Sequence, residues 1–290
     1  MNKYFTLLIC LINLNLWGQE DVKDIVRKMF QRNTGKTYYA NNTLISCQYK
    51  IMKKKGKSKK KCTSPPRKKV FESLYYEFQV KGIDKKSLSI ITGPINERGM
   101  KFMQVDYIKD EKVSDQWMYL PALKKMKRIV SPQDSPRSGS FFGSEISYED
   151  IEKHSVQDFT YQRNKDEVID DKKAWVIEMT PTEEKSQKSS YAKSKHWIDQ
   201  ISYLALKSEY YSEKGKLVKT FYQKKIQQKK GVWLPLQTIV VSHEKSRMSM
   251  MKLNNVVINE KMDEGIFHQR SLKDESYLSQ KMKNIRKKMD

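Results

Sequence analysis

The chain has 290 residues, of which 38% are hydrophobic and 31% are charged, with 11 Gly and 8 Pro. This composition excludes a collagen-like or Pro/Gly-rich protein and a wholly disordered one, and it provides a sizeable core for one large or two ordinary domains. Because 57 Lys and Arg outnumber 34 Asp and Glu, the net charge is +23, and we expect an anionic partner: nucleic acid, membrane head groups or an acidic protein.

The N-terminus has the pattern of a secretory signal peptide. Lys3 precedes an apolar run over residues 4–16, and Gly18 stands just before acidic residues. The run is shorter than a membrane span, and Cys10 lies inside it rather than at the cleavage point, so we expect removal of residues 1–18 from a soluble periplasmic protein. Since exported proteins rarely meet nucleic acid, an anionic membrane surface or a membrane protein becomes the expected partner.

Short strands dominate the predicted secondary structure. Residues 21–32 carry apolar side chains at helical spacing, which predicts one amphipathic helix. From residue 43 onward, alternating apolar runs predict strands over 44–52, 70–80, 87–93, 100–108, 116–120, 174–180, 195–200, 203–211, 217–227, 233–242 and 251–259. Turn signals such as Lys214-Gly215 separate these runs, so we expect one sheet system with few helices.

A lysine-rich run separates Cys47 from Cys62. If the flanking segments pair symmetrically, the two cysteines face each other across a hairpin, and a disulfide there contributes about 3 kcal/mol in the chain-entropy model. Two free buried thiols are the alternative. At the expected tip, Lys53, Lys54 and Lys55 either dock on anionic head groups or guard an exposed edge strand against aggregation.

Two segments depart from the strand pattern. Pro, Ser and Gly interrupt it over residues 131–143, and a short helix capped by Ser147, with Asp150 in its first turn, is expected to follow. Within this segment, Phe141 and Phe142 predict either a loop over a cavity mouth or a turn packed into the core. Residues 273–290 are rich in Lys and poor in apolar residues, which predicts a frayed helix or a disordered tail.

Four segments in this order resemble the outer-membrane lipoprotein-sorting family of LolA-like periplasmic carriers: residues 117–123, the basic cluster at 124–128, residues 139–144 and residues 147–150. Weaker similarity continues downstream, as far as about residue 272. The resemblance implies a mainly β (α+β) fold: an incomplete, strongly curved antiparallel β-barrel with helices and loops covering an apolar cavity. The chain then divides into a signal peptide (1–18), a LolA-like domain (19–272) and a basic tail (273–290). Glu145 and Ala205 stand where the family usually has Asp and Pro.

A lipid cavity holds acyl chains by apolar area and shape, so large apolar side chains on one strand face should contact the ligand. Strand alternation places Trp117 with Tyr119, and Phe102 with Gln104, but does not tell which set faces inward. The residues expected to contact lipid are Phe102, Trp117, Tyr119, Phe141, Phe142, Ile146, Trp175 and Ile177. Ordinary core packing is the alternative for each of them.

The sequence contains no HExxH, GxSxG or P-loop, and its four His lack metal-ligand spacing, so we expect no catalytic residue, metal or cofactor. The basic residues Lys124, Lys125, Lys127 and Arg128 are expected to face an inner-membrane transporter. The predicted function is a periplasmic lipoprotein-sorting or lipid carrier that passes acyl chains towards an outer-membrane acceptor, with residues 131–143 and the following helix as a moving lid. The alternatives are an accessory protein of a membrane lipid or RND-type exporter and a hydrolase of envelope lipids.

Overall fold

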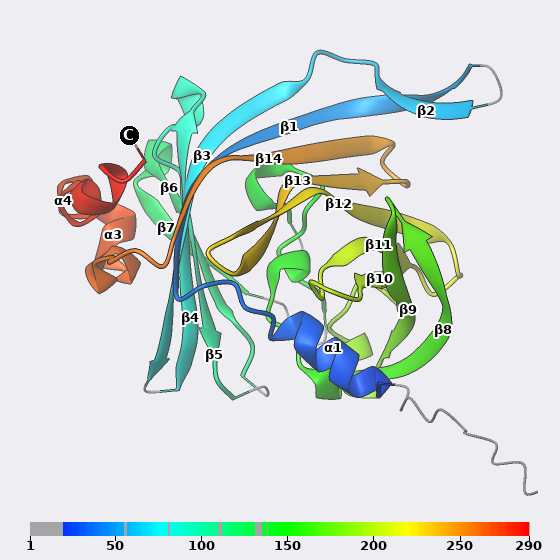
Figure 1. The fold of residues 1–290 in the computed structure, drawn as a ribbon. Coiled ribbons are helices and arrows are strands. Elements are labelled where there is room, and N and C mark those ends of the chain that lie inside the picture. Colours follow the sequence, from blue (N-terminus) through cyan, green and yellow to red (C-terminus); the bar gives the residue numbers. More distant parts are fainter. Residues whose placement is uncertain are drawn as a thin grey trace, which may run out of the picture.

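A single antiparallel sheet dominates the described part of the protein (Figure 1). The computed structural model describes residues 20–54, 57–80, 82–109, 112–130, 135–137 and 139–289. The predicted signal peptide, Lys55, and residues 131–134 and 138 of the predicted lid lie outside these ranges. No helix of the described part is long and apolar enough to cross a membrane.

Among the described residues, the sheet has fourteen strands. They are β1 (Thr37–Lys54), β2 (Lys57–Cys62), β3 (Arg67–Val80), β4 (Ile83–Gly93), β5 (Lys101–Tyr107), β6 (Asp115–Leu120), β7 (Lys125–Ile129), β8 (Phe159–Ile169), β9 (Lys172–Pro181), β10 (Lys193–Asp199), β11 (Ala205–Tyr211), β12 (Leu217–Lys229), β13 (Val232–Ser242) and β14 (Arg247–Ile258). The helices are α1 (Val22–Phe30), α2 (Glu183–Ser186), α3 (Arg270–Lys273) and α4 (Glu275–Arg286). Short 3-10 helices are η1 (Ile95–Glu97), η2 (Pro121–Leu123), η3 (Phe141–Gly143), η4 (Glu149–Ile151), η5 (Val156–Asp158) and η6 (Glu264–Phe267).

All of the predicted strand segments fall on strands of this sheet, and α1 matches the predicted N-terminal helix. Strands β2, β7 and β8 were not predicted from alternation. Each is rich in charged residues, and most side chains of β7 and β8 are exposed or half-buried. Alternation is a signal of burial on one face, so strands with both faces near solvent do not produce it.

The strands follow the order β7-β6-β5-β4-β3-β1-β14-β13-β12-β11-β10-β9-β8, with β2 paired to β1 outside this path. Long strand β1 therefore lies in the middle, next to β3 on one side and β14 on the other. Strands β7 and β8 end the path, so the sheet is open. The prediction of a mainly β, antiparallel fold with few helices is confirmed.

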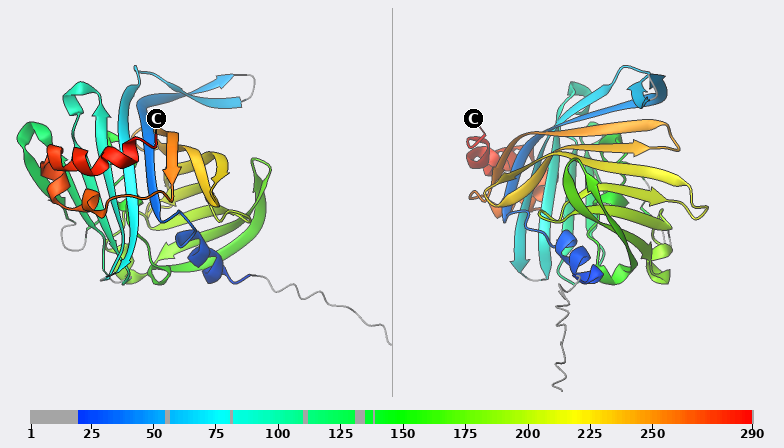
Figure 2. Two further views of the ribbon diagram at one scale, coloured as in Figure 1. Left: turned by 60° about the vertical axis from the view of Figure 1, so that its left-hand side comes forward. Right: turned by 45° about the vertical axis from the view of Figure 1, so that its right-hand side comes forward.

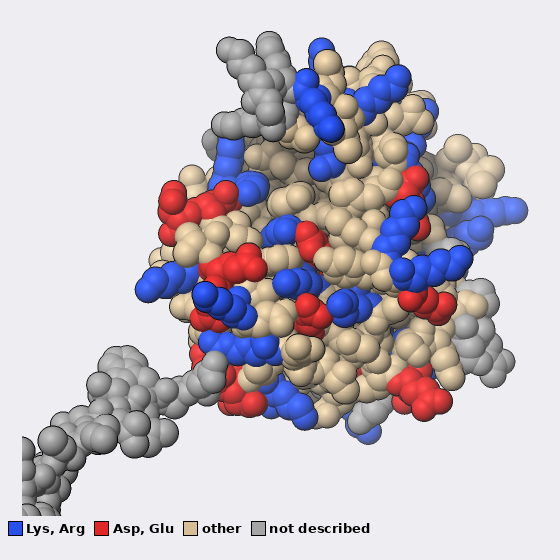
Figure 3. Space-filling model, turned by 90° about the vertical axis from the view of Figure 1, so that its right-hand side faces the viewer, with Lys and Arg blue, Asp and Glu red and all other residues tan. Residues whose placement is uncertain are grey.

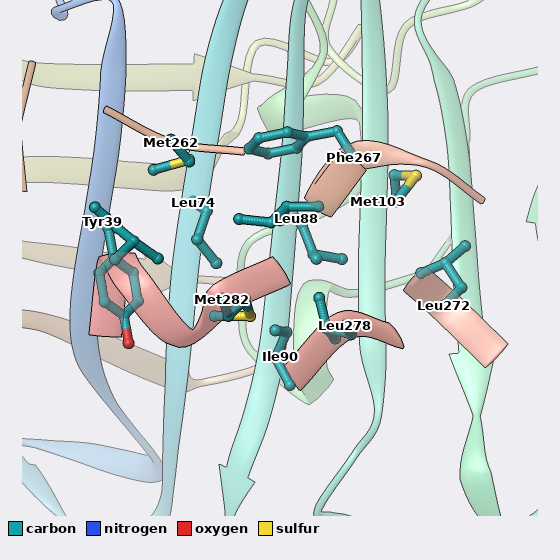
Figure 4. Packing of buried hydrophobic residues seen from close by; sticks show 12 residues of the cluster. Tyr39, Leu74, Leu88, Ile90, Met103, Met262, Phe267, Leu272, Leu278 and Met282 are labelled. Carbon is teal, nitrogen blue, oxygen red and sulfur yellow. The ribbon is translucent and has the colours of Figure 1, made fainter. Parts of the chain in front are cut away.

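The C-terminal helices cover one face of β1 and β3 to β5 (Figure 4). On α4, Leu278, Met282 and Ile285 are buried, and they belong to one hydrophobic cluster with Leu88 and Met103. The prediction of a frayed or disordered tail is wrong for this helix. Its apolar residues are few, but their spacing puts them on one side, and burying each contributes roughly 1.5–3 kcal/mol.

Beyond Tyr49, whose N–H donates to the Ser246 carbonyl, strand β1 leaves its neighbours in the sheet and pairs with β2 alone. The two strands form a ribbon that projects past the ends of the neighbouring strands (Figures 1 and 2). Cys47 and Cys62 are joined at its base by a disulfide with a Cα–Cα distance of 5.7 Å. Of the two interpretations given above for these cysteines, the disulfide is confirmed.

Candidate functional site

Strand register decides which side chains face which layer. Phe102 pairs with Met118, and Met103 pairs with Trp117, so each pair lies on its own face of the sheet. Met103 and Trp117 belong to the cluster beneath the C-terminal helices, whereas Phe102 and Met118 belong to a cluster on the opposite face. We call that opposite face, which also receives Phe141, the inner face.

An aromatic cluster fills part of the inner face. Phe141 and Phe142 are only 8% and 2% exposed. The ring of Phe141 lies 5.4 Å from that of Phe102, and the ring of Phe142 lies 5.5 Å from that of Phe71. Such edge contacts add about 0.5–1.5 kcal/mol each beyond area burial. Of the two interpretations of the Phe pair, the core-packed turn is confirmed.

Hydrogen bonds from several strands hold the segment that follows, residues 144–152. Gln104 Nε2 on β5 donates to the Ile151 carbonyl at 2.8 Å, and Gln116 Nε2 on β6 donates to the Tyr148 carbonyl at 3.2 Å. From the other side, Arg247 Nε on β14 donates to the buried Glu145 carboxylate at 2.6 Å. Because these partners lie on both halves of the sheet, the segment is fixed in place.

Asp150 is the centre of a buried polar network in this segment. Its carboxylate accepts from Lys219 Nζ at 2.6 Å, Tyr191 Oη at 2.7 Å and the Ser147 backbone N–H at 2.6 Å. Ser147 Oγ accepts in return from the Asp150 N–H at 3.3 Å, but the N-cap of η4 is Tyr148 and not Ser147 as predicted. Burial, with the nearby carboxylates, raises the pKa of Tyr191, so its hydroxyl stays protonated and donates.

Beside this network lies a cavity of about 260 Å³. Strands β9 to β12 form one wall, and α1 and residues 149–159 form others. Its apolar lining consists of Met29, Phe30, Phe159, Met179, Pro181, Ala205 and Phe221; its polar lining includes Glu149, Asp150, Lys185, Lys193, Ser194, His196 and Ser208. The cavity thus offers both an apolar surface and polar groups that could orient a ligand.

Helix α1 is positioned by its apolar face. Ile25 and Val26 are fully buried in a cluster with Trp175, Ile177 and Ile198 of the sheet. Met29 and Phe30 follow one turn later on the same face and reach the cavity. A polar contact of the helix with the rest of the chain, from Lys28 Nζ to Tyr203 Oη, is exposed and long at 3.4 Å. Apolar burial therefore dominates the attachment of α1.

Two histidines in the cavity wall are held neutral. His196 lies between two serines, with Nδ1 2.9 Å from Ser208 Oγ and Nε2 2.9 Å from Ser194 Oγ. Burial lowers the pKa of His196 to about 3. Burial and the cation of Lys185 lower the pKa of His154 to about 4. At neutral pH neither ring carries a charge into the cavity.

None of the eight residues expected to contact lipid lines this cavity. Phe102, Phe141, Phe142 and Ile146 form the aromatic cluster, which contacts Phe221 of the cavity wall. Trp175 and Ile177 lie beneath α1, and Trp117 and Tyr119 lie on the opposite face of the sheet. Their contact with lipid stays a prediction.

Phe30, His196, Tyr210 and Phe221 were not predicted from the sequence as site residues. The helical spacing of Phe30 was visible, but a helix face that packs on a sheet and one that roofs a cavity look alike in sequence. The strand residues could not be grouped from the sequence because it does not give the register between β10 and β11. In the structure, His196 lies opposite Ser208, and Ser194 lies opposite Tyr210.

The predicted basic contacts lie away from the cavity. Lys124, Lys125 and Lys127 are exposed around the β6–β7 turn, and Arg128 pairs with Asp115. Lys53 is exposed on the ribbon; the side chain of Lys54 lies outside the described residues, as Lys55 does. Within the described ranges, no group of three or more His, Cys, Asp or Glu is placed to hold a metal ion.

Residues 83–274 match the model of a protein family described as an uncharacterized protein family. The chain belongs to this family. No curated protein matches the sequence.

Solved structures share the fold of this family member. A putative outer membrane lipoprotein-sorting protein domain from Vibrio parahaemolyticus is 24% identical, with a TM-score of 0.72 over 87% of this chain and 97% of that one. A DUF1329 family protein from Desulfovibrio piger is 23% identical, with a TM-score of 0.72 over 86% and 97%. A LolA superfamily protein from Nitrosomonas europaea is 19% identical, with a TM-score of 0.58 over 86% and 98%. The resemblance to LolA-like proteins is therefore confirmed for the fold.

Proposed function

We propose that the protein is an exported carrier that binds the acyl chains of a lipid or lipoprotein, without covalent chemistry, in the cavity beneath α1. The observation that carries this proposal is a cavity with apolar walls, roofed by a helix whose attachment is mainly apolar. Acyl chains offer area and shape rather than hydrogen bonds, and such walls match them. The Cys47–Cys62 disulfide supports an oxidising compartment such as the periplasm.

The proposed cargo follows the printed name of the Vibrio parahaemolyticus structure, a lipoprotein-sorting domain. In our proposal the open sheet acts as an incomplete, curved barrel, with its inner face around the acyl chain and its polar wall near the head group. Lys185 and Lys193 supply cations there, and Ser189 and Ser194 supply hydroxyls. A carrier of this kind would receive cargo from an inner-membrane transporter and deliver it to an outer-membrane acceptor.

We assign the moving lid to α1 rather than to residues 131–143 and the following helix. Residues 144–152 are tied to β5, β6, β12 and β14 by buried polar contacts, each of which is costly to break. A cavity of about 260 Å³ is also slightly smaller than ordinary ligand pockets of roughly 300–1,000 Å³. Displacement of α1 would enlarge it, uncover Trp175 and Ile177, and give access past Phe221 to the aromatic cluster.

A cavity-filling substitution tests the carrier function. Ala205 lines the cavity, and its methyl group takes no part in the hydrogen bonds of His196 with Ser194 and Ser208. Ala205→Phe should therefore fill the space and leave those hydrogen bonds intact. Ala122→Phe, at an exposed position in η2, is the matched control. Native mass spectrometry with lipid extraction should find an acylated species on the wild type and the control but not on Ala205→Phe. An empty cavity in a folded wild-type protein purified from the envelope would refute the proposal.

A second candidate, an accessory protein of a membrane lipid or RND-type exporter, is favoured by the basic cluster of Lys124, Lys125, Lys127 and Arg128. Lys124 lies in the turn before β7, and the other three lie on β7, the last strand on one side of the sheet, where an edge can pair with a partner. Charge reversal at all four positions should abolish capture of a membrane protein from the native envelope. Retention of lipid without any such capture would favour the carrier instead.

A further inference from the structure

The ribbon formed by β1 beyond Gln48 and by β2 carries a charge pattern found nowhere else in the chain. Residues 47–62 contain eight Lys and no acidic residue, and the whole stretch between Asp24 and Glu72 lacks Asp and Glu. Viewed from the side to which the ribbon projects, the coloured charged residues at the top of the molecule are Lys and Arg, set among uncharged residues, whereas acidic and basic residues mix below (Figure 3). No acid of the ribbon itself therefore offsets these charges.

Exposed apolar side chains stand among these lysines. Ile51 is 61% exposed and Met52 is 51% exposed. Met52 lies opposite Lys59, and on a two-stranded ribbon it shares its face with Lys50 and Lys61, the next neighbours along the two strands. A surface in which single apolar side chains are surrounded by lysine stems suits the boundary between lipid head groups and acyl chains.

The ribbon is also built to project. The last β1 residue paired with β3 is Ser46 and the last paired with β14 is Gln48; the Tyr49 N–H still donates to the Ser246 carbonyl, and beyond it neither strand of the ribbon pairs with β3 or β14. The disulfide between Cys47 and Cys62 ties its two strands together at the point of departure. This arrangement presents lysines and apolar residues ahead of the body of the protein in a defined orientation.

We propose that the end of this ribbon docks the protein on an anionic lipid bilayer. Lysines of both faces bind the phosphates, Lys50, Lys59 and Lys61 from one face and Lys53 from the other, and Met52 and Ile51, one from each face, insert among the head groups. Clusters of four to eight basic residues bind anionic bilayers in this way. The two apolar residues favour a bilayer over a soluble polyanion, which offers no apolar phase. The docking goes beyond the proposed carrier function and does not depend on it, since no described ribbon residue lines the cavity.

Co-sedimentation with vesicles tests the docking. The mature protein should bind vesicles of phosphatidylcholine mixed with phosphatidylglycerol, and raising the salt concentration should weaken binding. Replacing the four lysines with Gln should weaken binding at least about tenfold. The matched control replaces four exposed lysines near the C-terminal helices, on the opposite side of the molecule: Lys261, Lys273, Lys283 and Lys287. Equal losses in both variants would refute a specific role for the ribbon and leave only net charge.

A second variant separates a bilayer from other polyanions. Ile51→Ser with Met52→Ser keeps every lysine and should weaken vesicle binding severalfold, while binding to heparin stays unchanged. Ile95→Ser with Ile201→Ser, at residues 81% and 73% exposed elsewhere, is the control. If the Ile51/Met52 variant binds vesicles as the wild type does, or if the wild type prefers heparin to vesicles, the partner is a polyanion and the bilayer proposal fails. Lipid retained in the cavity, measured on the same samples, reports on the carrier function separately.

Discussion

Replacing Ile25 with Ala should detach helix α1 from the sheet without unfolding the sheet itself. Ile25 is fully buried and packs with Trp175, Ile177 and Ile198, so the truncation removes apolar contacts and leaves a void. Such substitutions cost roughly 2–5 kcal/mol, and we take about 3 kcal/mol for this site. Since about 1.4 kcal/mol corresponds to a factor of ten, the detached state should become about 150-fold more populated.

The lost free energy of packing destabilises α1 in particular, because the helix is attached to the sheet only at its surface. It pairs with no strand, and the loop of residues 31–36 connects it to β1. Local opening of such an element requires less free energy than global unfolding, so its amides should exchange first. If the cavity is the lipid site, cargo release should accelerate by the same factor.

Hydrogen exchange measured by mass spectrometry is the direct assay. Peptides from α1 should lose protection in Ile25→Ala, while peptides from β1 and β13 keep it. Lys23→Ala is the control, since Lys23 is exposed on the same helix. The reasoning is refuted if α1 and the central strands lose protection equally, because the helix would then unfold only with the sheet; unchanged protection of α1 would refute the estimate of its attachment energy.

Three further predictions concern stability. Lys219→Met should destabilise the protein by about 3–5 kcal/mol in urea unfolding, because Asp150 is left buried without its cation. Asp150→Asn in the same chain removes the unpaired charge and keeps an acceptor for Tyr191 and Ser147, so it should recover much of the loss; no recovery would contradict this account. Leu278→Ala on α4 should cost about 2–5 kcal/mol, whereas the exposed Ser279→Ala should cost almost nothing; a similar midpoint for both would mean that α4 is not part of the core. Lowering the pH from about 6.5 towards 4 should reduce the thermal midpoint of unfolding. The unfolded chain protonates His154 and His196 in this range, whereas in the folded protein their pKa values are about 4 and about 3. His196→Gln should flatten this pH dependence, and an unchanged slope would exclude His196 as a cause.

Local patterns predicted much of this fold. Alternation located the strands that bury one face, and the helical spacing of Ile25, Val26, Met29 and Phe30 located α1. The Lys214-Gly215 signal does mark the turn between β11 and β12, where Gly215 adopts a positive φ of 69°. These features depend on residues close in the chain, so the sequence displays them directly.

Helix α4 and the cavity needed more than local pattern. The docking of α4 depends on three apolar residues within a lysine-rich segment. They stabilise the helix only when they pack against the sheet face that carries Leu88 and Met103. The cavity brings together Phe30, His196 and Phe221, which come from three distant elements. Nothing in one segment indicates the surface that another will offer.

The sequence by itself determined the class of fold, the strands with one apolar face, the basic hairpin and its cysteines. Tertiary structure alone decided that Phe102 faces inward and Trp117 outward, that Asp150 meets Lys219, and that α1 roofs the cavity. The physical reason is that alternation specifies two faces but not their partners. Burial becomes favourable only against a complementary surface, and here that surface comes from residues far away in the chain.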